Sequence, residues 1–325
     1  MAYAIDLAAV RAAHERIQHL VHRTAIATNN TVNQSTGLEV FFKPENTQLT
    51  GAFKLRGALN AILHLKETNP NCKGVVTHSS GNHGQALSYA AARAKIPCTV
   101  VVPENAPSVK VKGIRSHGAK VVLCEATAQA RQETCDRLAA QENLTAIPSY
   151  NYPDVMSGQG TISLELLDQV PDLDAILVAI SGGGLASGVL MAAKSIKPSI
   201  KVFIVEPKEK MLEECIRSGE RLWPNPPRLM NTIADGMRIQ QPGSLTWPII
   251  RDMAEKSTVA LEDEEIIAGM KFAFENMKMV VEPSGASTVA AVLSDRFKDL
   301  AKEHGLKRVA VIISGGNVDL HNLPW

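Results

Sequence analysis

The sequence predicts an α/β protein in which helices flank open, twisted and mostly parallel β-sheets. Short runs of apolar, often β-branched residues alternate with longer segments of helical pattern along the 325-residue chain. Several runs are apolar throughout, as in strands that are covered on both faces of a parallel sheet. The repeated order of strand and helix is typical of right-handed crossovers, which connect parallel strands.

Six runs have the length and composition of buried strands. In chain order they read GVVT, CTVVV, KVVLC, AILVAI, KVFIV and RVAVII, and they occupy residues 74–77, 98–102, 120–124, 175–180, 201–205 and 308–313. All of them fall far short of the roughly 18 apolar residues that a membrane-spanning helix needs.

Helical segments lie between and beyond these strands. They are predicted over residues 53–66, 85–94, 126–141, 160–169, 185–195, 263–277 and 286–303. Neither an internal repeat nor a linker rich in proline and serine divides the chain. Because the densest series of β–α units lies within residues 69–151, we predict a small domain there. Residues 1–68 and 152–325 would then form one discontinuous large domain.

The composition excludes several classes of protein. With 45% hydrophobic residues the chain is neither disordered nor a disulfide-stapled miniprotein. A formal net charge of +1 and 4% aromatic residues favour neither nucleic acid nor an anionic membrane as a partner. The five cysteines form no CxxC pair, and charged residues interrupt the first segment, unlike a secretory signal. We therefore expect a cytoplasmic protein.

Ser181-Gly182-Gly183-Gly184 follows the strand at 175–180 and opens a helix. Glycines in this position let successive backbone N–H groups converge on one anion, and the helix N-terminus adds partial positive charge. The pattern predicts a phosphate-binding loop, with close packing of helix on strand as the alternative. It is not a dinucleotide fingerprint, because the third glycine of that motif would fall on Ser187.

Lys54 stands at the start of the helix predicted at 53–66. The helix dipole disfavours a positive charge there, and burial would lower the pKa of the amine further. A neutral amine is what Schiff-base chemistry requires. The alternative is a surface lysine on an amphipathic helix.

Two more polar loops follow strands. Residues 77–84 combine small hydroxyls, an amide, two histidines and glycines, a set suited to binding a carboxylate or to capping a helix. Residues 314–317 read Ser-Gly-Gly-Asn and suit a tight turn. Open α/β sheets place their ligands at the carboxyl ends of strands, so we expect these loops to meet in one crevice.

Together the loops resemble the fold-type-II family of pyridoxal-phosphate enzymes, and within it the branch of serine racemases and serine/threonine dehydratases. The resemblance covers the chain from about residue 10 to residue 320, and the loops occur in the family's order at close to its spacing. It implies a two-domain fold like that of the tryptophan synthase β-subunit, pyridoxal 5'-phosphate (PLP) as cofactor, a small amino-acid substrate and a homodimer.

The resemblance also implies roles for individual residues. Lys54 would carry the cofactor as a Schiff base, Asn82 would bond the ring 3'-oxygen, and Ser314 would face the pyridine nitrogen. The implied cofactor-binding residues are Phe53, Lys54, Asn82, Tyr150, Ser181, Gly182, Gly183, Gly184, Leu185 and Ser314. The implied substrate-binding residues are Ser79, Ser80, Gly81, Asn82, His83, Arg131, Asp235 and Glu282.

Ser80 decides between the activities found in this branch. Dedicated dehydratases often carry alanine there, and a hydroxyl suggests a second acid–base group opposite Lys54. The resemblance thus implies racemisation of L-serine to D-serine, with side α,β-elimination to pyruvate and ammonia. The alternatives are a dehydratase of L-serine, L-threonine or 3-hydroxyaspartate, an aspartate racemase, and a non-catalytic ligand-binding α/β protein.

The family's divalent-cation site is only partly matched. Glu206 is present, but Leu212 stands where the family has aspartate and supplies no side-chain oxygen for Mg²⁺ or Ca²⁺. We therefore expect no tight divalent-cation site at Glu206. Glu213 and Glu214 could substitute, or the ammonium of Lys210 could occupy the place of the cation.

A nucleotide effector is also only partly supported. Gln85, Lys278 and Asn317 match positions that line the ATP site of animal serine racemases, whereas Leu49 and His117 do not.

Overall fold

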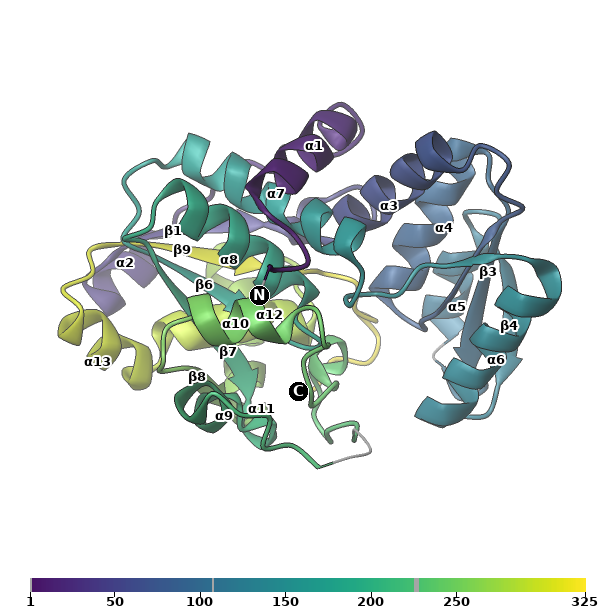
Figure 1. Ribbon diagram of the computed structural model, residues 1–325. Coiled ribbons are helices and arrows are strands. Elements are labelled where there is room, and N and C mark those ends of the chain that lie inside the picture. The colour runs from purple at the N-terminus through teal and green to yellow at the C-terminus, as the bar shows by residue number, and fades with distance from the viewer. Residues whose placement is uncertain (1, 107, 225–227) are drawn as a thin grey trace.

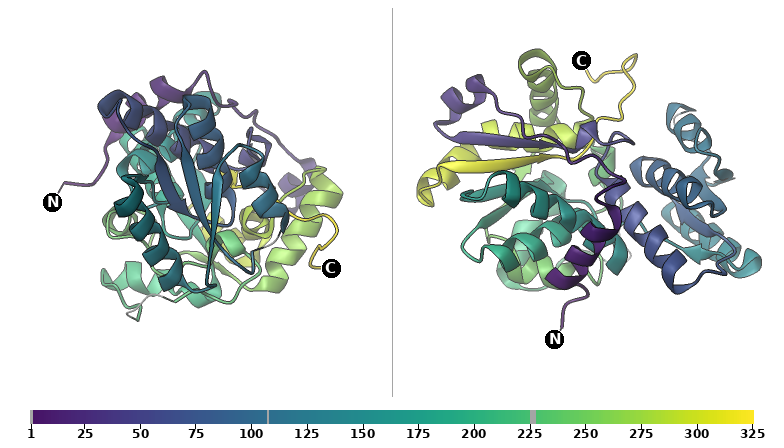
Figure 2. Two further views of the ribbon diagram at one scale, coloured as in Figure 1. Left: turned by 90° about the vertical axis from the view of Figure 1, so that its right-hand side faces the viewer. Right: turned by 90° about the horizontal axis from the view of Figure 1, so that it is seen from above.

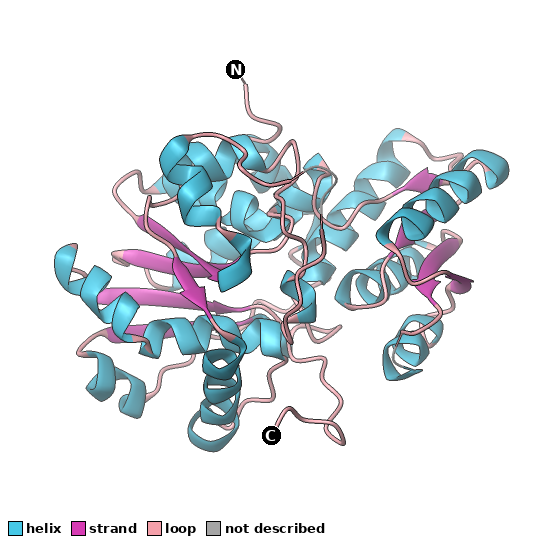
Figure 3. Cartoon of the chain, turned by 90° about the horizontal axis from the view of Figure 1, so that it is seen from below, coloured by secondary structure: helices cyan, strands magenta, loops and turns pink. Residues whose placement is uncertain are grey.

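The computed structural model of the protein describes residues 2–106, 108–224 and 228–325, and its strands form two separate sheets (Figures 1 and 3). The larger sheet has the strand order β1-β9-β6-β7-β8 and the smaller one β4-β3-β2-β5. Neighbouring strands within both sheets run parallel, which confirms the predicted α/β class. The strands are β1 (Glu39–Pro44), β2 (Val75–His78), β3 (Cys98–Pro103), β4 (Lys120–Cys124), β5 (Thr145–Ala146), β6 (Ala175–Ala179), β7 (Lys201–Pro207), β8 (Val259–Leu261) and β9 (Arg308–Ile313).

Helices cover both faces of the larger sheet, so its central strands are apolar on both sides. Ile176 and Val178 of β6 pack into one core with α1 (Leu7–Ile17), α7 (Pro153–Gln169), α8 (Gly184–Ile196) and α10 (Trp247–Met253). Leu177, between them, belongs to the opposite core, with α2 (Asn30–Thr36), α11 (Asp263–Phe272), α12 (Pro283–Leu293) and α13 (Asp295–Glu303). This arrangement explains the uninterrupted apolar runs in the sequence.

The smaller sheet is also sandwiched between helices. Val76 and Val101 pack against α6 (Ala128–Glu142), whereas Val100 and Val102 pack with Ile114 of α5 (Ser108–Arg115). Helix α4 (Asn82–Ala94) shares a core with α3 (Lys54–Thr68), and α3 also lies against α7, between the two sheets (Figure 2). All four strands of this sheet fall within residues 69–151. This supports the proposed two-domain division, which remains a prediction.

The six predicted strands are present with ends that differ by at most two residues, but β1, β5 and β8 were not predicted. All three lie at a sheet edge. An edge strand is paired on one side only, and these three are short or partly polar, so they lack the uninterrupted apolar run of a central strand.

The single helix predicted over residues 286–303 is wrong. The structure has α12 and α13 instead, separated at Ser294, whose backbone is extended with ψ 148°. The hydroxyl oxygen of Ser294 accepts a hydrogen bond from the backbone N–H of Phe297 and so caps α13.

Short helical turns connect the main elements. They are η1 (Glu45–Thr47), η2 (Lys208–Lys210), α9 (Leu212–Ser218), η3 (Asp235–Met237) and the π-helical turn η4 (Ala273–Met277). Within the described residues, no helix has the length and apolar character needed to cross a membrane. All five cysteines are free thiols.

Candidate active site

Backbone hydrogen bonds join the loop that ends in Lys54 to the loop that follows β9. The backbone N–H of Phe53 donates to the carbonyl of Ser314 at 3.0 Å, and Gly316 donates to Gly51 at 2.9 Å. Gly51 adopts a left-handed backbone with φ +72°, which lets the chain turn into α3. The structure thus brings together Phe53, Lys54 and Ser314, three of the predicted cofactor residues.

The amine of Lys54 lies where several of the loops meet. It donates a hydrogen bond to the carbonyl of Ser149 at 2.8 Å and lies 5.1 Å from the centre of the Phe53 ring. Burial lowers the pKa of Lys54 to about 8, and the carboxylate of Glu282 opposes this shift. An amine with such a pKa is neutral far more often near pH 7 than an ordinary lysine, as Schiff-base chemistry requires.

The glycine-rich loop before α8 packs closely against Tyr150. A Cβ added at Gly182 would lie 2.4 Å from the Tyr150 ring, and one at Gly184 would lie 2.8 Å from the Tyr150 backbone. Gly183 has φ +94° and caps α8. Any larger residue at Gly182 or Gly184 would clash with Tyr150, so the close packing requires glycine at both positions. The first backbone N–H groups of α8 have no intrahelical partner and are available to an anion. Tyr150 therefore lies against the loop, and its role in cofactor binding stays a prediction.

The turn between β2 and α4 carries Ser79, Ser80 and Gly81. The hydroxyl of Ser79 accepts the backbone N–H of Gly81 at 3.3 Å, and the Ser79 N–H donates to Val101 at 3.0 Å. Ser80 is partly buried in the same turn. These bonds hold the turn in shape and place the N-terminus of α4 beside it.

Asn82 joins this turn to the segments that carry Glu282 and Asn317. Its amide nitrogen donates to Glu282 at 2.6 Å, and its amide oxygen accepts from Asn317 at 2.9 Å. Asn82 keeps a second N–H for a cofactor oxygen. Glu282 is buried, and burial, reinforced by the charge of Asp235, raises its pKa to about 8.

His83 and Arg131 lie around the same turn. The His83 ring is buried and bonds the carbonyl of Ile147 at 3.0 Å, so the side chain faces inward and the backbone N–H is left for a ligand. Burial, reinforced by the Lys54 charge, lowers the pKa of His83 to about 3, which keeps the ring neutral. The Nε atom of Arg131 is buried without a hydrogen-bond partner among the described residues. An orphaned guanidinium N–H fits a carboxylate ligand.

Asp235 of η3 forms an ion pair with Lys110 of α5 and so connects the two sheet-containing regions. Sequence reasoning did not identify Lys110, because its partner is 125 residues further along the chain. It also missed the carbonyl of Ser149 as the partner of Lys54. Neither contact has a local sequence pattern.

The residues around Glu206 do not fit a divalent cation. One carboxylate oxygen of Glu206 accepts the backbone N–H of Leu212 at 2.8 Å, and the other accepts the hydroxyl of Thr258. Among the described residues, no group of three or more His, Cys, Asp or Glu side chains could hold a metal ion. The Lys210 ammonium lies nearby on backbone carbonyls, which supports the alternative that an ammonium takes the cation's place.

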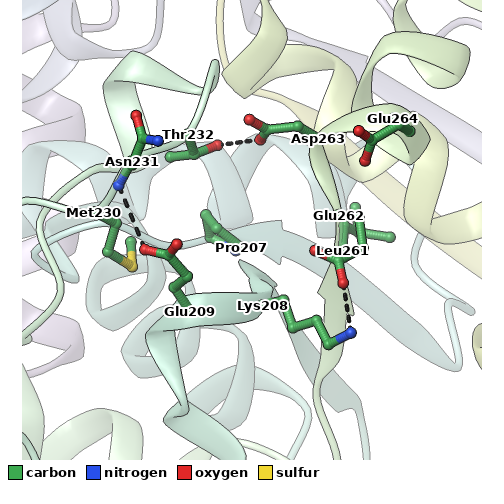
Figure 4. Close-up of a pocket in the computed structure, with 10 residues that line it drawn as sticks. All are labelled: Pro207, Lys208, Glu209, Met230, Asn231, Thr232, Leu261, Glu262, Asp263 and Glu264. Carbon is green, nitrogen blue, oxygen red and sulfur yellow. Dashed lines mark hydrogen bonds and ion pairs between the residues drawn. The ribbon is translucent and has the colours of Figure 1, made fainter.

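A separate surface pocket of about 210 Å³ lies beyond the end of β7 (Figure 4). Two of its carboxylates already have side-chain partners: Thr232 donates to Asp263, and Lys208 pairs with Glu262. None of the predicted catalytic or cofactor residues lines it. The lining residues are Pro207, Lys208, Glu209, Met230, Asn231, Thr232, Leu261, Glu262, Asp263 and Glu264.

Comparison with known proteins decides the family. A family model described as "Pyridoxal-phosphate dependent enzyme" matches residues 17–315. The chain belongs to this family. The predicted family, fold class and PLP cofactor are therefore confirmed, and the protein is an enzyme.

Similar proteins cover nearly the whole chain. A serine racemase of Dictyostelium discoideum is 47% identical over 98% of this chain and 97% of its own. The solved structure of a PLP-dependent aspartate racemase has a TM-score of 0.97 and 47% identity, and the match covers 100% of this chain and 99% of that one. The solved structure of a T.th. threonine deaminase has a TM-score of 0.87 and 34% identity, with 97% and 99% covered.

Proposed function

We propose that the protein racemises L-serine to D-serine with PLP, and that it also eliminates water from serine to form pyruvate and ammonia. The observation that carries the proposal is the Lys54 amine with its lowered pKa, positioned where the predicted cofactor loops converge. The serine racemases among its relatives, at 41–47% identity over nearly full length, support the substrate.

The residues that would hold the cofactor are those of the crevice. Residues 181–185 would bind the phosphate. Phe53 and Tyr150 would pack beside the cofactor, and Asn82 and Ser314 would contact its ring. When bound to Lys54, PLP supplies an electron sink for negative charge that develops at the substrate Cα. A hydroxyl such as that of Ser314 leaves the pyridine nitrogen less charged than a carboxylate would, so this sink is moderate.

Proton transfer at Cα would use two side chains. The freed amine of Lys54 removes the Cα proton from one face of the substrate. The hydroxyl of Ser80 returns a proton to the other face, which inverts the centre. If the β-hydroxyl leaves as water instead, hydrolysis yields pyruvate and ammonia, so both outcomes share the first proton removal.

The substrate carboxylate would bind at the turn of residues 79–83. The N-terminus of α4 offers backbone N–H groups and partial positive charge. The buried Nε of Arg131, without a partner among the described residues, offers a further donor on the same side. Asp235 and Glu282 would border the bound substrate near its amine or hydroxyl.

Aspartate racemisation is the second candidate, because the aspartate racemase structure matches this chain with a TM-score of 0.97. The deciding experiment incubates the enzyme in D₂O with L-serine, L-aspartate, L-threonine or L-3-hydroxyaspartate. Cα deuteration, the D-isomer and the keto acid are followed together. We expect D-serine and pyruvate from L-serine. Pyruvate forming orders of magnitude faster than D-serine would favour a dehydratase, and D-aspartate as the main product would favour the second candidate.

Lys54→Ala should abolish all three signals with L-serine. Borohydride reduction of the wild-type holoenzyme, followed by peptide mapping, should locate the cofactor on Lys54. A label on another residue would refute the proposal.

The homodimer and the nucleotide effector are proposed from the resemblance, and the cytoplasmic location from the cysteines and the charged first segment. A homodimer is tested by light scattering of the purified holoenzyme, and a cytoplasmic location by cell fractionation. Titration of the elimination rate with ATP tests a nucleotide effector. An unchanged elimination rate at saturating ATP would exclude a nucleotide effector.

A further inference from the structure

The ammonium of Lys210 is fully buried next to the glycine-rich loop. It donates hydrogen bonds to three backbone carbonyls: Ser181 at 2.9 Å, Ile239 at 2.7 Å and Gln240 at 2.7 Å. An ammonium has three N–H donors, so all of them are used. Lysine side chains are rarely buried this completely, so the burial of Lys210 calls for a structural explanation.

The surrounding chain fixes the position of this ammonium. Lys210 ends η2, directly before Met211, which adopts a left-handed backbone with φ +56°. The indole N–H of Trp223 donates to the carbonyl of Lys210 at 2.6 Å. Glu206, at the end of β7, bonds the next helix through Leu212. The lysine backbone is therefore anchored on both sides of its side chain.

The three carbonyls belong to two segments, the proposed phosphate loop and a segment that packs against it. Ser181 begins the glycine-rich loop, and Ile239 and Gln240 lie in the segment that leads to Thr246. The hydroxyl of Thr246 donates to the carbonyl of Gly182 at 2.8 Å, so the two segments are also bonded further along. Lys210 joins the same two segments through its bonds to Ser181, Ile239 and Gln240.

A cation inside a ring of backbone carbonyls is an arrangement that proteins also build around metal ions. Here the ring is filled by the chain's own ammonium, and both oxygens of Glu206 are already bonded. The positive charge lies close to the loop that would receive a phosphate dianion.

We propose that Lys210 is a positioning residue, a built-in cation that holds the glycine-rich loop in its phosphate-binding shape and makes PLP binding independent of an added divalent cation. The proposal rests on the phosphate role given above to residues 181–185.

The test measures the dissociation constant of PLP from apoenzyme by the visible absorption of the bound cofactor. Lys210→Ala opens a cavity, and Lys210→Met removes the charge but keeps apolar bulk. Lys208→Met is the matched control, because Lys208 lies in the same turn with an exposed side chain. We expect PLP to bind about tenfold to a hundredfold more weakly to both Lys210 variants, a range typical when a residue that orients a binding site is lost. Lys208→Met should bind PLP like wild type.

Two further measurements separate positioning from general damage. Methylammonium should restore much of the PLP affinity of Lys210→Ala, while tetramethylammonium at equal ionic strength should not. Pyridoxal, which lacks the phosphate, should be trapped by borohydride on Lys54 equally in wild type and in the variants. If Lys210→Ala does not fold, Lys210→Met and the wild-type response to chelator still decide the matter.

The proposal is overturned if either Lys210 variant binds PLP as tightly as wild type, or if a chelator weakens PLP binding to the wild-type enzyme. These results leave the role of Lys54 untouched. Conversely, a borohydride label found away from Lys54 would refute the proposed function, whatever the Lys210 variants show.

Discussion

Arg56 offers a quantitative test of how the helix that carries Lys54 is held. Its guanidinium is fully buried and forms two bidentate pairs, with Glu45 at 2.7 and 2.8 Å and with Glu165 at 2.6 and 2.9 Å. Lys43 also bonds Glu165, at 2.7 Å. Burial alone would lower the pKa of Arg56, but the two carboxylates outweigh it and raise that pKa.

Arg56→Ala leaves two buried carboxylates with only Lys43 to balance them. Breaking a buried ion pair on one side costs about 3–5 kcal/mol, because the remaining charge is uncompensated. The total free energy of unfolding of a domain is about 5–15 kcal/mol, so the loss should be large. Arg251→Ala is the control, because Arg251 pairs with Asp252 at the surface and such pairs contribute about 0–1 kcal/mol.

The measurement is urea unfolding of the holoenzymes, followed by the fluorescence of the three tryptophans. A second variant replaces the whole network with neutral residues: Lys43→Met, Glu45→Gln, Arg56→Met and Glu165→Gln. Because no charge is then left alone, it should recover much of the lost stability. An Arg56→Ala loss below about 1 kcal/mol would refute the reasoning, since that is the range of a surface pair. No recovery in the fourfold variant would assign the loss to packing.

Three further outcomes are expected at the active site. Ser80→Ala should lose D-serine formation while keeping part of the pyruvate formation from L-serine, measured by chiral chromatography and a coupled keto-acid assay. Equal loss of both products would contradict a role on one face only. The rate constant for PLP binding to apoenzyme should rise about tenfold per pH unit below pH 8 and level off above it, because neutral Lys54 is the reactive form and its pKa is about 8. A plateau reached only near pH 10.5, the ordinary value for lysine, would contradict the burial effect. Gly182→Ala should weaken PLP retention, because the added Cβ would lie 2.4 Å from the Tyr150 ring. The control Gly113→Ala meets only the flexible end of Gln85 and should retain PLP on dialysis like wild type.

The central strands and the glycine-rich loop could be predicted because their signals are local. The runs at 175–180 and 308–313 are apolar on both faces, and the glycines directly after β6 mark a strand-to-helix turn. The edge strands β1, β5 and β8 lack that pattern. The break at Ser294 also escaped prediction, because its serine is one cap residue within a segment of otherwise helical pattern.

Several structural contacts join residues that are far apart in the chain. Asn82 meets Glu282 200 residues away, and Arg56 meets Glu165 109 residues away. The resemblance placed Asn82 and Glu282 at the site, but nothing in the sequence indicated that they bond each other. Arg56 lies two residues after Lys54, yet only the structure reveals that it is buried.

Two of the fully buried cations, Arg56 and Lys210, show how the chemistry of the partners determines the role of a charge. Arg56 faces carboxylates, and its planar guanidinium matches two of them in bidentate geometry, which suits a fixed joint between helices. Lys210 faces neutral carbonyls from different directions, which suits a compact ammonium. Burial lowers the pKa of Lys210 to about 7, with Glu206 opposing, whereas the carboxylates raise the pKa of Arg56. The carbonyl partners leave the charge of Lys210 less neutralised than that of Arg56, and this charge lies beside the loop where a phosphate dianion would bind. A cofactor phosphate at that loop would therefore favour the charged form of Lys210, so the ammonium and the phosphate would stabilise each other.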